Sequence, residues 1–250
     1  MGEQSHMSDE FVASLAQLLN AAQVPCVLWG HFLLCTHGVP TIVGEIDFVV
    51  PDELLSAATG ALGQHEMLLP CKDGKECRIV SPKRLTPAPD SHLHIEGTEV
   101  PVGLFIQSVT LWFLPPLEAA LITPDQGQLP APYALASDES ILPTWRPERG
   151  AGVFKPGAHP VVIVRSHVLL EAFMRICARY SHTLAGSFSK SMVLYMSMYV
   201  DDDGYLDLKQ LPEPLVSSYL AYTTTKISGR QWLAELRQMF GEPALLPEEE

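Results

Sequence analysis

The apolar positions of the first 160 residues follow two different spacings. Residues 8–22 place Phe11, Leu15 and Leu18 on one helical face, and Ser8 stands where its side chain can cap the first turn. Short runs rich in β-branched and aromatic residues instead predict buried strands. The expected strands are Cys26–Trp29, Glu45–Val50, Arg78–Val80, His92–Glu96, Val102–Ile106 and Val109–Leu114, and the further expected helices are His31–His37, Asp52–Leu62 and one near Leu117–Leu121.

Long amphipathic periods without intervening strands begin at Ser166. In residues 166–180, Leu169 and Phe173 share a face, and Glu171 stands four residues before Arg175, the spacing of a helical ion pair. The chain is therefore predicted to be an α/β protein with a mixed sheet, followed by a mostly helical C-terminal region. The other helices expected there are Phe188–Val200, Pro214–Thr223 and Ser228–Phe240.

This change of pattern gives the expected domain organisation. An α/β domain over residues 8–160 precedes a helical domain over residues 161–243, with the boundary near residues 157–164. Residues 1–7 are interpreted as a tag or a disordered start, because Ser5-His6-Met7 is typical of a cloning junction. Residues 244–250 are expected to be a disordered acidic tail.

Charge and composition narrow the classes of function. The 250 residues carry 16 Lys+Arg against 29 Asp+Glu, a formal net charge of −13, which disfavours binding to a nucleic-acid backbone. Apolar runs end well before the roughly 18 residues that a membrane span needs, and no signal peptide is recognisable. The cysteines number five and form no Cys-x-x-Cys pair, so we expect reduced thiols that fill the core of a cytoplasmic protein.

Two carboxylates stand out on the predicted strand 45–50. Glu45 and Asp47 are two residues apart, so on a strand they point to the same side. Paired acids repel each other unless a cation lies between them, and the first 71 residues contain no Lys or Arg. A divalent metal ion is the expected partner, and the other source of positive charge is an arginine folding back from later in the chain.

A glycine precedes this pair at the end of another predicted strand. Gly30 follows Trp29 and opens the helix expected at 31–37, where a glycine lets a ligand approach the backbone and a helix start presents free N–H groups to an anion. Glycine, helix start, loop and two carboxylates together indicate a site for phosphate and metal.

This arrangement resembles the nucleotidyltransferase superfamily that includes DNA polymerase β and the minimal nucleotidyltransferases. The matching residues are Trp29-Gly30-His31, a spacer of thirteen residues, and Glu45-Ile46-Asp47-Phe48. The stretch HGVPTIVGEIDFVVPD is similar to that of fungal nucleotidyltransferase-like proteins. The resemblance covers residues 24–64, and a helical half after an α/β half also suits the family.

The resemblance implies an activity and a set of site residues. Glu45 and Asp47 would hold Mg²⁺ or Mn²⁺, Gly30 and His31 would contact the phosphates, and a nucleoside monophosphate would pass from an NTP to a small molecule or protein. The family has a third carboxylate on a later strand, for which Glu96 is the first candidate and Glu99 the second. His31 replaces the small residue that the family has after the glycine.

Other polar residues are weaker candidates for the site. His92 and His94 alternate on a predicted strand, so they are either pocket residues that bind substrate, two ligands of a metal that needs a third, or ordinary residues of a polar face. Lys190, on a later helix, is a candidate contact for an anionic substrate. The remaining cluster is a run of cations, Lys72, Lys75, Arg78, Lys83 and Arg84, which either faces phosphate or is a solvated hairpin.

Two alternatives to nucleotidyl transfer remain open from the sequence. The fold can be reused for metal-independent small-molecule catalysis, such as cyclisation or isomerisation, with Asp47 and the histidines His31, His92 or His94 as acid and base. The third hypothesis is a non-catalytic binding module whose acidic surface suits a basic partner. A small-molecule substrate, no nucleic acid and no membrane are expected in either enzymatic case.

Overall fold

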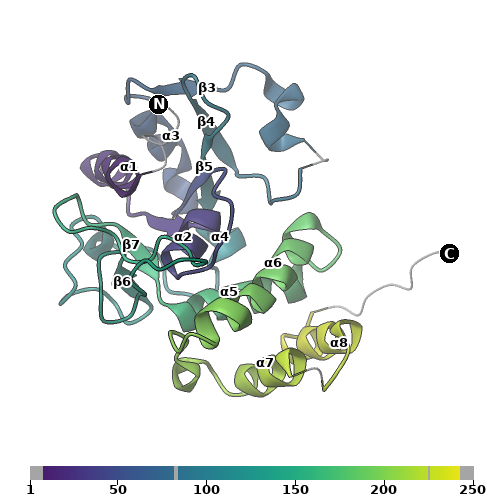
Figure 1. The fold of residues 1–250 in the computed structure, drawn as a ribbon. Helices are drawn as coiled ribbons and strands as arrows, with labels where there is room; N and C mark the ends of the chain where they lie inside the picture. Colours follow the sequence, from purple (N-terminus) through teal and green to yellow (C-terminus); the bar gives the residue numbers. More distant parts are fainter. Residues whose placement is uncertain (1–7, 82–83, 225, 243–250) are drawn as a thin grey trace. The chain divides into compact units, whose positions relative to one another are not determined.

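The chain divides into two compact units in the computed structural model, which describes residues 8–81, 84–224 and 226–242 (Figure 1). The first unit contains the residues up to Arg84 together with residues 88–165, and the second contains residues 85–87 and those from Ser166 onward. The predicted tag, residues 1–7, and the predicted tail, residues 244–250, lie outside the described residues.

A five-stranded mixed sheet forms the centre of the first unit. Strand β2 pairs antiparallel with β1 and parallel with β5, and β4 pairs antiparallel with both β5 and β3. All residues of β1 and β2 are buried, as expected for strands covered on both faces. The order across the sheet is β1 (Val27–Trp29), β2 (Ile46–Val50), β5 (Pro101–Ile106), β4 (Ser91–Ile95) and β3 (Leu68–Pro70).

Helix α3 covers one face of β4 and β5, and the opposite face, which carries His92 and His94, is called the polar face of the sheet. Helix α3 packs against β4 and β5, where Gly63 approaches Leu93 and Thr59 donates a hydrogen bond to Ser91. Side chains alternate along a strand, and Ser91 and Leu93 face α3. His92 and His94 therefore point to the opposite face. The helices of this unit are α1 (Asp9–Ala21), α2 (Gly30–Thr36), α3 (Leu55–Leu62) and the short α4 (Gln107–Thr110).

Several sequence predictions for the first unit are confirmed, including the mixed sheet and the cap of the first helix. The Ser8 hydroxyl accepts a hydrogen bond from the backbone N–H of Phe11 at 3.2 Å. Three further strands, each of three residues, have no counterpart among the predictions. They are β3, and the pair β6 (Tyr133–Leu135) and β7 (Val162–Val164), which form a separate two-stranded sheet.

Two expected strands are wrong, and local hydrogen bonds explain both. Residues 78–80 form a 3₁₀ turn, η4, because the Cys77 thiol accepts the Ile79 N–H and closes the turn. The strand expected at Val109–Leu114 is also absent. Residues 107–110 instead form α4, where the Thr110 hydroxyl donates a hydrogen bond to the Ile106 carbonyl. The other 3₁₀ turns of the first unit are η2 (Asp52–Leu54), η3 (Gly74–Glu76) and η5 (Ala119–Leu121), the last within the predicted helix 117–121.

The second unit is helical, as the sequence predicts. Phe173, Tyr219 and Trp232 are fully buried in it, and the Trp232 ring stacks on Tyr222 with 4.2 Å between centroids. None of the helices within the described residues combines the length and apolarity of a membrane span. The elements are α5 (Ser166–Arg179), α6 (Leu184–Tyr195), the π-helical η6 (Met196–Asp201), the 3₁₀ turn η7 (Leu208–Gln210), α7 (Leu215–Thr223) and α8 (Gly229–Met239).

Candidate functional site

Asp47 lies in a cradle made by two glycines on the polar face of the sheet. Its neighbours across the sheet are Trp29 on β1 and Gly103 on β5. A Cβ atom placed on Gly30 would lie 2.5 Å from Asp47 Oδ2, and one placed on Gly103 would overlap Asp47 Oδ1. Gly30 also has a positive φ of 66°, a conformation that glycine adopts readily. Both positions therefore need glycine to admit the Asp47 carboxylate.

Glu45, directly before β2, is held by two cationic or protonatable side chains. Arg84 donates a hydrogen bond to Glu45 Oε2, and His31 Nδ1 lies 3.4 Å from Glu45 Oε1. These three side chains expose only 9–15% of their area. Arg84 lies 39 residues after Glu45 in the sequence. It is therefore an arginine from later in the chain, rather than a metal ion, that contacts Glu45 in this structure.

The two carboxylates have opposite electrostatic environments. Burial raises the pKa of Asp47 well above its usual range, the Glu45 charge raises it further, and Arg84 offsets part of the shift. Burial also raises the pKa of Glu45, but the hydrogen bond from His31 and the charge of Arg84 outweigh it, so this pKa is lowered. Within the pair, Glu45 is therefore the stronger acid, and Asp47 is the one that keeps its proton to higher pH.

The resemblance implies Mg²⁺ or Mn²⁺ between these carboxylates, and the residues present do not fit such an ion. Asp47 Oδ1 is buried without a hydrogen-bond partner, so this atom could contact a metal. Both oxygens of Glu45, however, already face Arg84 and His31. Strand β5, the neighbour of β2, carries no carboxylate and presents Gly103 beside Asp47. A buried acid with a raised pKa, beside an acid whose two oxygens already face Arg84 and His31, is a poor donor set for Mg²⁺.

Three other predicted site residues lie apart from this group. Glu96 is exposed beyond the end of β4, where its backbone N–H donates to Met67, and Glu99 pairs with Arg78 in the same turn region. Lys190 belongs to the second unit, where its Nζ lies against Gly229. Within the described residues, no third carboxylate joins Glu45 and Asp47.

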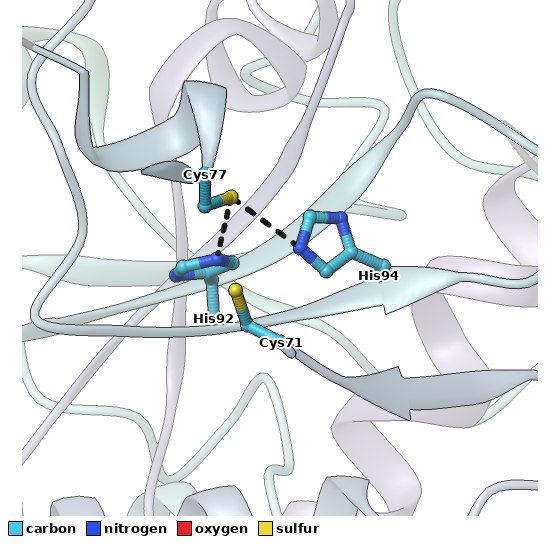
Figure 2. Close-up of side chains that lie close together, drawn as sticks. All are labelled: Cys71, Cys77, His92 and His94. Atoms are coloured by element: carbon cyan, nitrogen blue, oxygen red, sulfur yellow. Dashed lines mark hydrogen bonds between the residues drawn. The ribbon is translucent and has the colours of Figure 1, made fainter. Parts of the chain in front are cut away.

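His92 and His94 are brought together with two cysteines (Figure 2). Cys77 Sγ lies 3.4 Å from His92 Nε2 and 3.5 Å from His94 Nε2. Cys71 directly follows β3, and continuing the β3–β4 register by one residue sets it opposite His92. One donor atom from each of the four side chains lies within 4.8 Å of every other. We call these four residues the Cys/His cluster.

The sequence carries only a weak signal for this cluster. The spacing Cys-x₅-Cys followed by His-x-His differs from common zinc motifs, so the pattern alone favours core cysteines. The side chains that join the two histidines in the structure are Cys71 and Cys77, neither of which stands out in the sequence. Arg84 stands out in the sequence only as part of a cation run, of which Lys83 and the Lys75 side chain lie outside the described residues.

The acid pair and the Cys/His cluster share one face of the sheet. Gly103 pairs with Asp47 on one side and with His92 on the other. Two strand spacings, about 10 Å, therefore separate Asp47 from His92 along the sheet. Arg84 is close enough to both groups for its charge to act on Asp47 and on His92.

A groove elsewhere in the first unit does not reach these groups. It has a volume of about 690 Å³ and runs along α1 and residues 155–159. Asp9, Glu10, Lys155 and His159 contribute its polar groups.

Comparisons of the chain with protein-family models, with curated proteins and with solved structures find no match.

Proposed function

We propose that the first unit is an enzyme that moves protons within a small organic substrate, as in an isomerisation or a cyclisation. The observation that carries the proposal is Asp47, a buried acid whose Oδ1 has no hydrogen-bond partner and whose pKa is raised by burial. Strongly perturbed acids of this kind cluster at functional sites. We also propose a cytoplasmic location, which the five cysteines in thiol form support.

Asp47 is the proton donor in this proposal. A protonated carboxylic acid at neutral pH transfers its proton to a substrate oxygen or carbon and becomes a carboxylate. The positive charge of Arg84, which already acts on Asp47, then stabilises the carboxylate that forms. Gly30 and Gly103 carry no side chain that would fill the space of the Asp47 carboxylate, so the acid can occupy this position between them.

His31 is the proton acceptor, and Glu45 is its positioning residue. Glu45 Oε1 lies 3.4 Å from His31 Nδ1, an arrangement that favours the tautomer with its proton on Nδ1 and leaves Nε2 as the base. His31 Nε2 removes one proton from the substrate while Asp47 supplies another, so the substrate changes its bonding without net gain or loss of protons. Transfer of the proton from His31 back to Asp47 through solvent completes the cycle.

Deuterium labelling tests this function even while the substrate is unidentified. The wild-type protein is incubated with a mixture of small metabolites in D₂O without added Mg²⁺ or Mn²⁺, and products are followed by mass spectrometry. We expect deuterium incorporation or an isomerised product, reduced about 10²–10⁴-fold in Asp47→Asn and in His31→Gln. The exposed carboxylate variant Glu66→Gln is the matched control and should keep full activity. Equal labelling in all variants contradicts the proposal.

Metal-dependent nucleotidyl transfer is the second candidate. The observation that favours it is the juxtaposition of Gly30, Asp47 and Glu45, with the unpaired Oδ1 of Asp47 available to a ligand. It requires Arg84 to leave Glu45, so Arg84→Gln should then increase the thermal shift produced by an NTP with Mg²⁺. Under proton-transfer catalysis, NTP with Mg²⁺ gives no shift in either protein.

A further inference from the structure

We infer that Cys71, Cys77, His92 and His94 bind one Zn²⁺ ion as a structural site. Thiolate sulfur and imidazole nitrogen are the ligands that zinc prefers, and two of each form a common tetrahedral set. All four donor atoms already lie within 4.8 Å of one another in the structure. This inference is independent of the proposed function, because metal content is measured without a substrate.

The distances in the cluster match those around a tetrahedral zinc ion. Zn–S and Zn–N bonds of the usual length place a sulfur and a nitrogen ligand about 3.6 Å apart. Cys77 Sγ lies 3.4 Å from His92 Nε2 and 3.5 Å from His94 Nε2. Figure 2 shows all four side chains directed toward a common point, with Cys77 above the strand that carries both histidines. Little movement is needed to admit the ion.

Ordinary hydrogen bonding explains this group less well than a metal does. A thiol has one hydrogen, so Cys77 can donate to only one of the two imidazole nitrogens that face it. The histidine rings also meet edge to face with centroids 5.1 Å apart, which keeps both Nε2 atoms on the same sulfur. A zinc ion satisfies all four donors at once.

The segment that supplies the cysteines needs such an anchor. Residues 71–90 connect the antiparallel neighbours β3 and β4, where a connection of 2–5 residues is usual. In the described part of this connection between Cys71 and Ser81, the regular elements are the short 3₁₀ turns η3 and η4. Zinc would fix both ends of the first turn to the sheet, and because four protein ligands leave no open position, the site is structural rather than hydrolytic.

The zinc site would also hold Arg84 in place. The Ile79 N–H donates to Cys77 Sγ at 3.5 Å, as backbone amides do around metal-bound thiolates, and the Ile79 carbonyl accepts from Arg84 Nη1 at 3.2 Å. Arg84 in turn pairs with Glu45. A single residue of the connection, Ile79, thus joins the metal ligand to the arginine of the acid pair.

Elemental analysis of the purified chain tests the inference. The reduced protein is supplied with Zn²⁺, desalted and analysed by plasma mass spectrometry. We expect about one zinc per chain in the wild type, and at least a tenfold loss in Cys71→Ser and in Cys77→Ser. Cys35→Ser is the matched control: Cys35 is a half-buried thiol of the same unit outside the cluster, so this variant should keep its zinc.

Cobalt substitution keeps the test valid if a variant folds poorly. Co²⁺ added to the reduced wild type should give the visible bands of a tetrahedral site together with a thiolate charge-transfer band, which His94→Asn should weaken. Reduced, folded wild type that takes up neither zinc nor cobalt overturns the inference. Full zinc occupancy in both cysteine variants of the cluster overturns it as well, because the ion would then lie elsewhere.

Discussion

The acid pair and the Cys/His cluster occupy one face of the same sheet, but they differ in the chemistry of their donor atoms and in what surrounds those atoms. Glu45 and Asp47 are hard oxygen donors; Arg84 and His31 already pair with Glu45, and burial raises the pKa of Asp47. Cys71, Cys77 and the two histidines are soft donors gathered around one point. Gly103 separates the two groups, since it pairs with Asp47 on one side and His92 on the other.

This difference shows that a metal-site motif must be judged by what already surrounds its donors. Two acids at strand spacing indicate a cation, and an arginine guanidinium meets that need as well as a metal ion does. The Cys/His donors instead face one another, and their geometry is that of a zinc site. The following predictions separate the two groups, beginning with the largest effect.

Removal of Arg84 should give the largest loss of stability. Arg84→Met leaves the Glu45 carboxylate buried without its guanidinium, which costs about 3–5 kcal/mol in comparable sites. The free energy of unfolding is measured by urea denaturation of the zinc-loaded protein. The double variant Glu45→Gln/Arg84→Met removes both charges and should recover most of the loss. A double variant no better than the single one would contradict the pairing.

Zinc removal should destabilise the Cys/His cluster without acting through Asp47. At free zinc a thousandfold above its dissociation constant, binding stabilises the folded chain by about 4 kcal/mol. The melting temperature of the wild type should therefore fall on chelation, and that of Asp47→Asn should fall by the same amount. The unfolding of Cys77→Ser should not respond to chelation; an equal fall in this variant would place the metal elsewhere.

A side chain at Gly103 should disturb the acid pair and spare the metal. In Gly103→Ala the new methyl group overlaps Asp47 Oδ1 and lies 3.2 Å from Pro89 Cβ, which costs about 1–3 kcal/mol of unfolding free energy. Zinc content should stay unchanged. Gly44→Ala is the matched control, because its Cβ meets nothing within 4 Å. Equal stability of the two variants would show that Asp47 is not confined as described.

The smallest effect is a pH dependence that belongs to Asp47. Its pKa is raised by burial in the folded chain, so its stabilising contribution is complete below the unfolded pKa of about 4 and is lost as pH rises through the folded pKa. Asp47→Asn cannot ionise and should exceed the wild type in stability at high pH, by about 1.4 kcal/mol for each pH unit that separates the unfolded pKa from the higher folded pKa. The advantage should shrink as pH falls toward 4, and a constant offset in urea midpoints would contradict this.

The sequence predicted the strands around the acid pair better than the segment beside them. Apolar runs at Val27–Trp29, Ile46–Val50 and Val102–Ile106 identify their strands because all three are buried and rich in apolar residues. Residues 78–80 are also β-branched in part, but the Cys77 thiol closes a turn there. The strand propensity of these residues therefore did not decide their structure, because the hydrogen bond to the Cys77 thiol stabilises a turn.

For the candidate site, local spacing could predict pairs but not partners. Glu45 with Asp47 and His92 with His94 follow from alternation along single strands. Arg84 on Glu45, and Cys71 and Cys77 on the histidines, depend on how the connection after β3 returns to the sheet. Hydrophobic periodicity does not predict the path of this connection. Arg84, Cys71 and Cys77 could therefore be placed at the site only from the folded structure.

Anomalous diffraction from crystals supplied with both Zn²⁺ and Mn²⁺ tests the central claim, that a metal belongs to the Cys/His cluster and a proton to Asp47. Data collected on either side of the zinc edge distinguish the two metals at each position. We expect a zinc peak among Cys71, Cys77, His92 and His94, and no manganese at Glu45 and Asp47. Manganese between the two carboxylates, or no zinc peak at the cluster, would contradict it.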